Sequence, residues 1–281
     1  MNITKFILLN FFLFLTISCI TPKKEYTIEL NSDWKFQSEK GEPILPARVP
    51  GTVHLDLLEN EIIEDPFFRL NEHELQWIDK LDWNYRTYFN INDFHFDFDS
   101  IELDFFGLDT YADVFLNDSM IYSADNMFIG KTVNIKENII RGNNKLLVKF
   151  KSPIKVGIEK HDKLGYNLPE NANDLSEIGK VPENKKVGVF SRKAPYSFGW
   201  DWGPRLVTSG IWRPINLNFW NNFKIKDLHI TQNIIENNAF LMAEVELLSV
   251  IENQNVIAKI YVDNKLIKND LVFLKKGNCL F

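Results

Sequence analysis

The chain has 281 residues, of which 45% are hydrophobic and 25% are charged, a balance typical of a globular protein and unlike that of a disordered one. Aromatic residues make up 14% of the chain, which favours β-structure, where such side chains fit the pleated surface. The net charge is −6 and the lysines and arginines are scattered, so the sequence argues against nucleic-acid binding, which requires a basic stripe.

Residues 1–19 have the character of a signal peptide. An apolar run from Phe6 to Ile17 follows a single lysine, and it is too short to span a bilayer of about 30 Å. A small residue directly precedes Cys19, which resembles a bacterial lipoprotein signal in which Cys19 is acylated, although Thr16 departs from that signal. An ordinary signal peptide with an incidental cysteine remains the alternative. Either interpretation predicts export, and the first predicts a lipid anchor in the cell envelope, with residues 20–25 as linker.

From Tyr26 onward the apolar residues alternate with polar ones, as expected of strands. Residues 94–99 place their aromatic side chains on one face and predict a strand that forms a hairpin with the next strand. Residues 54–61 are the only fair helical candidate. Further strands are predicted at residues 101–105, 114–116, 120–122, 146–150 and 211–220, with turns at 117–119 and 142–144. Many short strands separated by turns predict a β-sandwich or jelly roll.

Residues 152–194 break this rhythm, because they show little periodicity and contain three prolines. A loop of this length in a compact domain is usually functional or disordered, so a functional loop and a mobile surface insertion both remain open.

A second unit is predicted after Trp220. Strand patterns occur at residues 224–230, 240–247 and 256–262, which look like the beginning of an immunoglobulin-like sandwich. The 61 residues from Asn221 to the end are fewer than the roughly 100 that such a domain takes. The sequence therefore predicts a partial, incomplete immunoglobulin-like domain over residues 221–281.

The densest aromatic cluster is residues 196–205, YSFGWDWGPR. In an extended backbone Trp200 and Trp202 would share one face and Asp201 would take the other. A flat aromatic ring with a carboxylate suits a sugar, which has apolar C–H faces and hydroxyl rims. The competing interpretation is a core-filling pair of tryptophans, with Asp201 bound to Arg205 or Arg213.

Several blocks of this sequence resemble β-mannosidases of glycoside hydrolase family 2, in the same order along the chain. They are the 196–205 cluster, residues 46–58 (PARVPGTVHLDLL), 65–72 (DPFFRLNE), 75–78 (LQWI), 82–85 (DWNY), 107–114 (GLDTYADV), 125–128 (DNMF) and 210–215 (GIWRPI). The resemblance covers roughly residues 26–220. It implies an all-β architecture, with a jelly-roll sugar-binding domain of the galactose-binding-like type over that range.

The same resemblance implies roles for individual residues. Trp200 and Asp201 are expected to contact the terminal mannose, Asp201 by accepting hydrogen bonds and Trp200 by shaping the pocket wall. Arg205 is expected to hold the loop rather than touch substrate. In this family two glutamates on a (β/α)8 barrel, about 5–5.5 Å apart in a retaining enzyme, perform the hydrolysis.

The chain itself is expected to contain no catalytic residue. A barrel requires about 250 residues, and only 61 follow the first predicted domain. Glu72 and Asp109 lie in blocks that the resemblance assigns to the sandwich, so they are not expected to replace the catalytic pair. No cofactor or metal is expected either, since the histidines lack metal-ligand spacing and no phosphate-binding loop or nucleophile elbow occurs. The histidines are His54, His73, His95, His161 and His229.

The function predicted from the sequence is the non-catalytic, amino-terminal portion of an exo-acting β-mannosidase. That enzyme removes terminal non-reducing β-D-mannose, and this chain would supply one wall of the mannose pocket. Two alternatives stay open: a free-standing carbohydrate-binding lipoprotein, and a chain that associates with a separate polypeptide carrying the barrel. The expected partners are a β-mannoside carbohydrate and a membrane, the latter through the lipid anchor alone.

Overall fold

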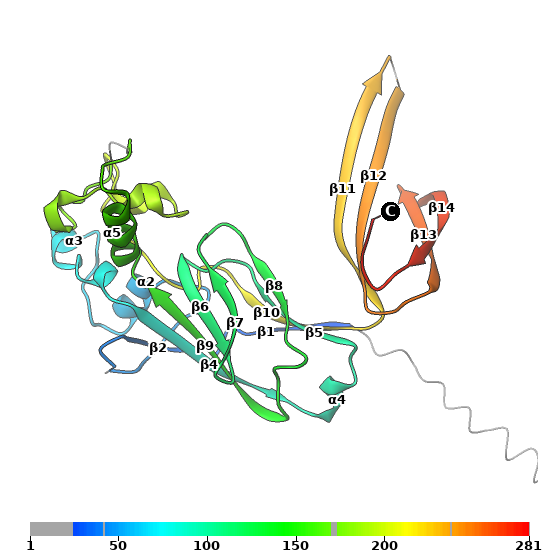
Figure 1. The fold of residues 1–281 in the computed structure, drawn as a ribbon, viewed down its shortest axis with the longest axis horizontal. Coiled ribbons are helices and arrows are strands. Elements are labelled where there is room, and N and C mark those ends of the chain that lie inside the picture. The colour runs from blue at the N-terminus through cyan, green and yellow to red at the C-terminus, as the bar shows by residue number, and fades with distance from the viewer. Residues whose placement is uncertain (1–24, 42, 170–172, 237, 281) are drawn as a thin grey trace, which may run out of the picture.

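Two antiparallel β-sheets form the larger part of the computed structural model, which describes residues 25–41, 43–169, 173–236 and 238–280 (Figure 1). The six-stranded sheet has the order β3-β2-β4-β9-β6-β7 and the four-stranded sheet the order β1-β10-β5-β8. The strands are β1 (Tyr26–Glu29), β2 (Lys35–Ser38), β3 (Leu45–Pro46), β4 (Trp83–Ile91), β5 (Ser100–Phe105), β6 (Tyr111–Leu116), β7 (Ser119–Ala124), β8 (Lys131–Asn134), β9 (Gly142–Lys151) and β10 (Ile215–Trp220). Cys19 and the predicted signal peptide lie outside the described residues.

The core of the sandwich lies between these sheets, because alternate side chains of each strand point inward. Along β4 the residues alternate between buried and more exposed from Trp83 to Ile91. Phe36, Tyr85, Phe150 and the other inward side chains of both sheets join in one hydrophobic cluster. The predicted jelly-roll sandwich is confirmed.

The β6–β7 hairpin confirms the predicted turn. Asn117 and Asp118 have φ angles of 49° and 66°. Two consecutive positive φ values are typical of the tight turn that matches the twist of paired strands, and Asn and Asp tolerate them. The helix predicted at residues 54–61 is also confirmed, as α2 (Val53–Glu59). The predicted strand at 211–220 begins only after Pro214, as β10.

The strand predicted at residues 94–99 is wrong. Asp93–Phe96 form a helical turn, α4, in which the Asn92 side chain and the His95 ring cap each other's backbone N–H groups. The aromatic residues Phe94 and Phe98 are four positions apart, and their rings meet edge to face with centroids 5.5 Å apart. Their spacing suits a helix as well as a strand, so the alternation did not distinguish the two.

Residues 152–194 contain a packed element that sequence reasoning missed. Helix α5 (Pro153–Leu164) begins at Ser152, whose side chain accepts a hydrogen bond from Lys155 N, and ends at Gly165, with φ 80°. Short 3₁₀ turns follow at Pro182–Asn184 (η2), Gly188–Phe190 (η3) and Pro195–Phe198 (η4). A second hydrophobic cluster is formed by Ile154, Val181, Val187, Phe198 and Val207. Ile154, Val181 and Val187 of this segment thus belong to a packed core.

A second unit follows β10. Its strands are β11 (Phe223–Ile235), β12 (Asn238–Ser249), β13 (Gln254–Val262), β14 (Lys265–Leu274) and β15 (Gly277–Leu280). They form a sheet β11-β12-β15 and a hairpin β13-β14, which contain the three strands predicted from the sequence. A small cluster around Leu247, Val272 and Leu274 forms their core. Assignment of this unit to a partial immunoglobulin-like domain stays a prediction.

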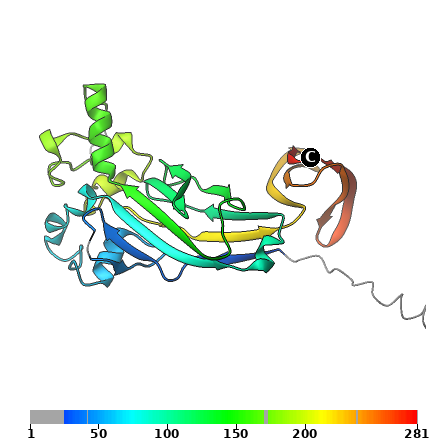
Figure 2. The same cartoon turned by 60° about the horizontal axis from the view of Figure 1, so that its bottom comes forward.

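The two ends of the sandwich differ. Helices α2, α5 and α3 (Asn71–Glu74) gather at one end, and the second unit lies at the other (Figures 1 and 2). Within the described ranges, no helix combines the length and the apolar character needed to cross a membrane.

Candidate functional site

The Trp200–Gly203 turn lies between η4 and β10, close to the end of η4. Trp200 and Gly203 form an antiparallel bridge, with Gly203 N donating to Trp200 O at 3.4 Å. Asp201 and Trp202 therefore occupy the tip of a tight turn. The tripeptide is therefore not extended, because the chain reverses direction within these four residues.

Gly199 fixes the start of the turn. Its φ of 130° lies in a region that other residues rarely adopt. A Cβ at this position would lie 2.5 Å from Leu175 Cγ and 2.6 Å from Asn173 O. Leu175 N also donates to Phe198 O at 2.9 Å. The approach to the turn is thus held against residues 173–175, and only glycine fits there.

Arg205 fixes the other side of the turn. Its side chain is fully buried, and Nη1 donates to Asp79 Oδ2 at 2.6 Å and to Gln76 Oε1. Its backbone N donates to Glu72 Oε1 at 2.7 Å, and its backbone O accepts from Gln76 Nε2 at 2.9 Å. Four contacts from residues 72–79 therefore hold one residue. This confirms that Arg205 holds the loop from within.

A buried polar layer surrounds this arginine. The backbone of Gly179 lies against the guanidinium, since a Cβ there would fall 2.3 Å from Arg205 Cζ. Asp174 accepts from Gly188 N at 2.8 Å. Burial raises the pKa of the Asp174 carboxyl, and the Gly188 N–H and the charge of Arg205 partly oppose that rise. Buried charged groups therefore lie beside the hydrophobic cluster that contains Phe198 and Val207, on either side of the turn.

The tip of the turn is open to solvent. Trp202 is 79% exposed, Trp200 is half-buried, and their ring centroids are 5.6 Å apart with an interplanar angle of 41°. Asp201 is exposed, and no hydrogen bond or ion pair connects its carboxylate to another described residue. The structure thus brings Trp200, Asp201 and Trp202 together, with both Asp201 oxygens available to accept hydrogen bonds.

The competing interpretation, a core-filling tryptophan pair, is wrong. Trp202 is exposed and Arg205 pairs with Asp79 instead of Asp201. The guanidinium of Arg213 lies over the ring of Trp212, 4.1 Å from its centroid. Neither arginine serves as a partner of Asp201.

Exposed apolar side chains occur both in the loop around the turn and in the segment that leads to the residues holding Arg205. The segment that clamps Arg205 continues from residues 65–71, which expose apolar side chains to solvent. The exposed apolar side chains of this segment and of the loop around the turn are Phe67, Phe68, Leu70, Trp77, Tyr166, Tyr196 and Trp202. A concentration of large exposed apolar groups is typical of an interaction surface. Apart from Tyr166, these residues lie in the blocks 65–72, 75–78 and 196–205 that the resemblance marked, but no periodicity in the sequence predicted that their side chains are exposed.

The carboxylates considered as substitute catalysts are engaged in structure. Asp109 is buried, and its Oδ2 accepts from Lys193 Nζ and, at 2.6 Å, from Thr208 Oγ1. Glu72 accepts from the backbone of Arg205. Burial lowers the pKa of Lys193, although Asp109 opposes that change. The interpretation of Asp109 and Glu72 as sandwich residues agrees with these contacts.

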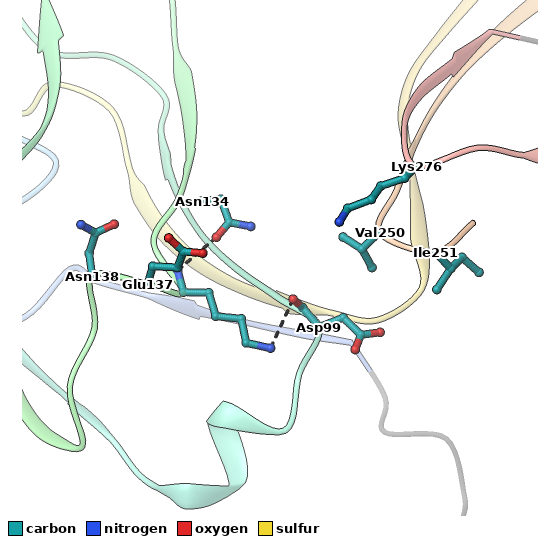
Figure 3. Close-up of a pocket in the computed structure, with 8 residues that line it drawn as sticks. Asp99, Asn134, Glu137, Asn138, Val250, Ile251 and Lys276 are labelled. Atoms are coloured by element: carbon teal, nitrogen blue, oxygen red, sulfur yellow. Dashed lines mark hydrogen bonds between the residues drawn. The ribbon is translucent and has the colours of Figure 1, made fainter. Parts of the chain in front are cut away.

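A cleft of about 600 Å³ lies between the sandwich and the second unit, and none of its lining residues belongs to the turn (Figure 3). Asp99, Asn134 and Glu137 line one side, and Val250, Ile251 and Lys276 the other. The Asp99 carboxylate accepts from Asn222 N at 2.9 Å. This carboxylate thus ties the junction together. In the described part of the chain, no three His, Cys, Asp or Glu side chains gather as metal ligands.

A comparison with models of protein families identifies the family of this chain. A model of the glycosyl hydrolase 2 galactose-binding domain-like family matches residues 34–213, which contain both the clamp and the turn. The chain belongs to glycoside hydrolase family 2.

The similar proteins of this family include β-mannosidases. The β-mannosidase of Bos taurus is 34% identical over 199 residues, which cover 70% of this chain and 22% of that protein. The β-mannosidase B of Thermothelomyces thermophilus is 34% identical over 208 residues, 72% of this chain and 23% of that protein. The chain therefore spans less than a quarter of the length of these curated relatives, and it matches their amino-terminal part.

Solved structures extend the likeness to the second unit. The β-D-mannosidase of Dictyoglomus thermophilum has a TM-score of 0.79 and 35% identity, over 91% of this chain and 30% of that one. The exo-chitosanase of Amycolatopsis orientalis has a TM-score of 0.63 at 19% identity, over 92% of this chain and 28% of that one, a likeness of fold.

Proposed function

We propose that this chain acts as the sugar-facing, amino-terminal portion of an exo-acting β-mannosidase. The observation that carries the proposal is the Trp200–Gly203 turn, whose tip presents an exposed, unpaired carboxylate between two tryptophans. The likeness to β-mannosidases over the residues that build this turn supports the choice of sugar.

In this proposal Asp201 accepts hydrogen bonds from two neighbouring hydroxyls of the terminal mannose, because an ionised carboxylate offers two acceptor oxygens. Trp200 shapes the wall beside the sugar and packs against its C–H face. The cleavage itself requires two carboxylates placed on either side of the glycosidic bond, and these belong to the barrel of the whole enzyme. The turn contributes binding energy, which raises the rate to the extent that it is realised in the transition state.

The exposed apolar side chains of residues 65–71 have a role in the same proposal. Phe67, Phe68 and Leu70 are each more than half exposed. Burying such side chains against another domain releases about 25 cal/mol per Å² of apolar area. Because residues 72–79 contact Arg205, this burial would help to place the turn at the pocket.

Export and membrane anchoring are a separate part of the proposal. Acylation of Cys19 after removal of the signal peptide would tether the protein to the cell envelope, on the periplasmic face or the outer-membrane surface. Metabolic labelling with a fatty-acid analogue tests it in a bacterial host. Labelling is expected in the wild-type chain and not in Cys19→Ser. Equal labelling of both would contradict acylation at this residue.

A free-standing sugar-binding lipoprotein is less well supported, since the exposed turn offers one wall of a pocket. A separate barrel-bearing chain would supply the missing walls, and co-purification of the two polypeptides would identify it.

A chimera tests the mannosidase proposal. Residues 26–220 of this chain replace the matching domain of the Dictyoglomus thermophilum enzyme, and hydrolysis of an aryl β-mannoside is measured. The chimera is expected to retain at least a tenth of the parent kcat/KM. In the chimera, Asp201→Asn is expected to lower kcat/KM by about 100-fold, since it weakens a charged hydrogen bond to substrate and leaves the partner hydroxyl poorly matched.

The matched control is Asp118→Asn, because that carboxylate is also highly exposed but lies at the β6–β7 turn. It is expected to leave kcat/KM unchanged. A folded chimera that is inactive, or one whose activity is insensitive to Asp201→Asn, would contradict the proposal.

A further inference from the structure

The outer face of the six-stranded sheet carries a cluster of cations at strands β2, β4 and β9. In these strands the neighbours of Lys35, Arg86 and Lys149 along the chain are buried, so these side chains point away from the core. Lys145 lies on the same face of β9. The four cations line one depression of about 270 Å³, and no carboxylate is among its lining residues.

The strand register places these charges close together. Lys35 and Arg86 are direct cross-strand partners. Arg86 is opposite Leu147 of β9, which makes Lys145 and Lys149 its two diagonal neighbours on that strand. Direct partners in an antiparallel pair have Cβ atoms about 5 Å apart and diagonal ones about 7–8 Å. Arg86 therefore stands at the centre of three lysines.

Like charges directly opposite each other destabilise a sheet. Compensation is partial: Lys145 pairs with Asp118 at 2.9 Å and Lys149 lies opposite Asp113 of β6, whereas Lys35 and Arg86 form no ion pair with another described residue. The chain as a whole carries a net charge of −6, so this concentration of positive charge runs against its overall balance. An anionic ligand would remove the repulsion.

The remaining lining groups narrow the chemistry of that ligand. Gln37 and Asn84 bring amides to the depression, and Gln37 Oε1 is buried without a hydrogen-bond partner among the described residues. Leu147 and Ile44 add apolar surface. An inorganic anion would use the cations alone. A ligand that uses all three kinds of group has an anionic substituent, hydroxyls and C–H surface.

We propose that this depression binds an acidic saccharide, with its carboxylate or sulfate group held by Arg86 and the surrounding lysines. The fork of the Arg86 guanidinium can donate two parallel hydrogen bonds to either group. Gln37 and Asn84 contact hydroxyls of the sugar. The site lies on β2, β4 and β9 and shares no residue with the Trp200–Gly203 turn, so it is independent of the β-mannosidase function.

Titration calorimetry of the 281-residue chain at low salt tests the proposal with four probes: trigalacturonate, a sulfated disaccharide, neutral mannotriose and inorganic sulfate. At least one of the two acidic saccharides is expected to bind with a submillimolar Kd, and to bind at least tenfold more tightly than inorganic sulfate. Which of the two binds more tightly identifies the anionic group. Raising the salt concentration is expected to weaken the binding, because the contacts are exposed charges.

Arg86→Gln is expected to weaken the acidic saccharide at least tenfold and to leave Tm equal or higher, because it removes one member of a like-charged pair. The matched control, Lys131→Gln, changes an exposed lysine of β8 in the other sheet and is expected to leave the affinity unchanged. The proposal is overturned if neither acidic saccharide binds at 10 mM, if inorganic sulfate or mannotriose binds as tightly, or if Arg86→Gln leaves the affinity unchanged.

Discussion

Arg205 Nη1 lies 2.6 Å from Asp79 Oδ2, and neither side chain is exposed to solvent. These two residues are 126 positions apart in the chain, yet their contact sets where the Trp200–Gly203 turn emerges. Leu175 holds the residues before the turn, and the Glu72–Asp79 segment holds the residue after it. Asp201 is thus presented by a tip whose two flanks are fixed, which suits recognition of a rigid ligand because little ordering entropy remains to be lost on binding.

Replacing Arg205 by methionine tests the clamp. The change removes the buried guanidinium from Asp79 Oδ2 and leaves only the part-exposed Lys80, 3.1 Å from Oδ1, to balance the carboxylate, so the free energy of unfolding is expected to fall by about 2–4 kcal/mol. Urea denaturation of the chain measures it. Arg213→Met, at an exposed arginine eight residues further on, is the control and is expected to change stability by less than about 1 kcal/mol. Equal effects of the two changes would show that Arg205 has no clamping role.

Gly199→Ala tests the approach to the turn. At this position alanine meets both an unfavourable φ of 130° and a clash with Leu175 and Asn173. Gly165→Ala is a matched control, since φ there is 80° and nothing lies within 4 Å of the added Cβ. The control is expected to cost about 1 kcal/mol and Gly199→Ala at least about 2 kcal/mol more, measured by urea denaturation. Similar costs would mean that residues 173–175 yield to the added methyl group.

Local patterns predicted one turn and one short helix correctly but failed for helices α4 and α5, and no pattern predicted the contacts between distant residues. The Asn117-Asp118 turn and helix α2 follow from residues adjacent in sequence. Helix α5 had its signals, Ser152-Pro153 at the start and Gly165 at the end, but Gly157 and a weak apolar face hid them. The sequence motif drew attention to Trp200 and Asp201. The position of their turn depends on the ion pair between Arg205 and Asp79, and no spacing in the sequence reveals that pair.

Histidine 54 gives the stability a pH dependence that can be isolated. Burial, and then the charges of Lys193 and Arg205, lower the pKa of His54 from 6.5 to about 3. In the unfolded chain His54 takes up a proton as the pH falls through 6.5, while in the folded chain it does not until about pH 3. The unfolded state therefore binds more protons in this window, and the contribution of His54 to stability is lost as the pH falls from 6.5 towards 3.

Asp56 acts in the opposite direction over part of that window. Burial raises the pKa of Asp56 from 3.8 to about 6. The hydrogen bond that Tyr85 donates to Oδ2, at 2.5 Å, partly opposes this rise. Its contribution is present below 3.8 and is lost as the pH rises through 6. His54→Gln removes only the first effect. Relative to wild type, the free energy of unfolding of His54→Gln is expected to rise by about 2–3 kcal/mol between pH 6 and pH 4. Parallel pH profiles of the two proteins would contradict the assignment.

The buried Lys193–Asp109 pair can be tested with a double-mutant cycle. Lys193→Met leaves Asp109 buried beside Thr208 without a cation, so it is expected to destabilise the chain by about 3–5 kcal/mol. Adding Asp109→Asn removes the stranded charge, and the double variant is expected to recover at least about 2 kcal/mol of that loss. Urea denaturation of the wild type, both single variants and the double variant measures the coupling. Additive effects would show that Asp109 and Lys193 contribute to stability independently.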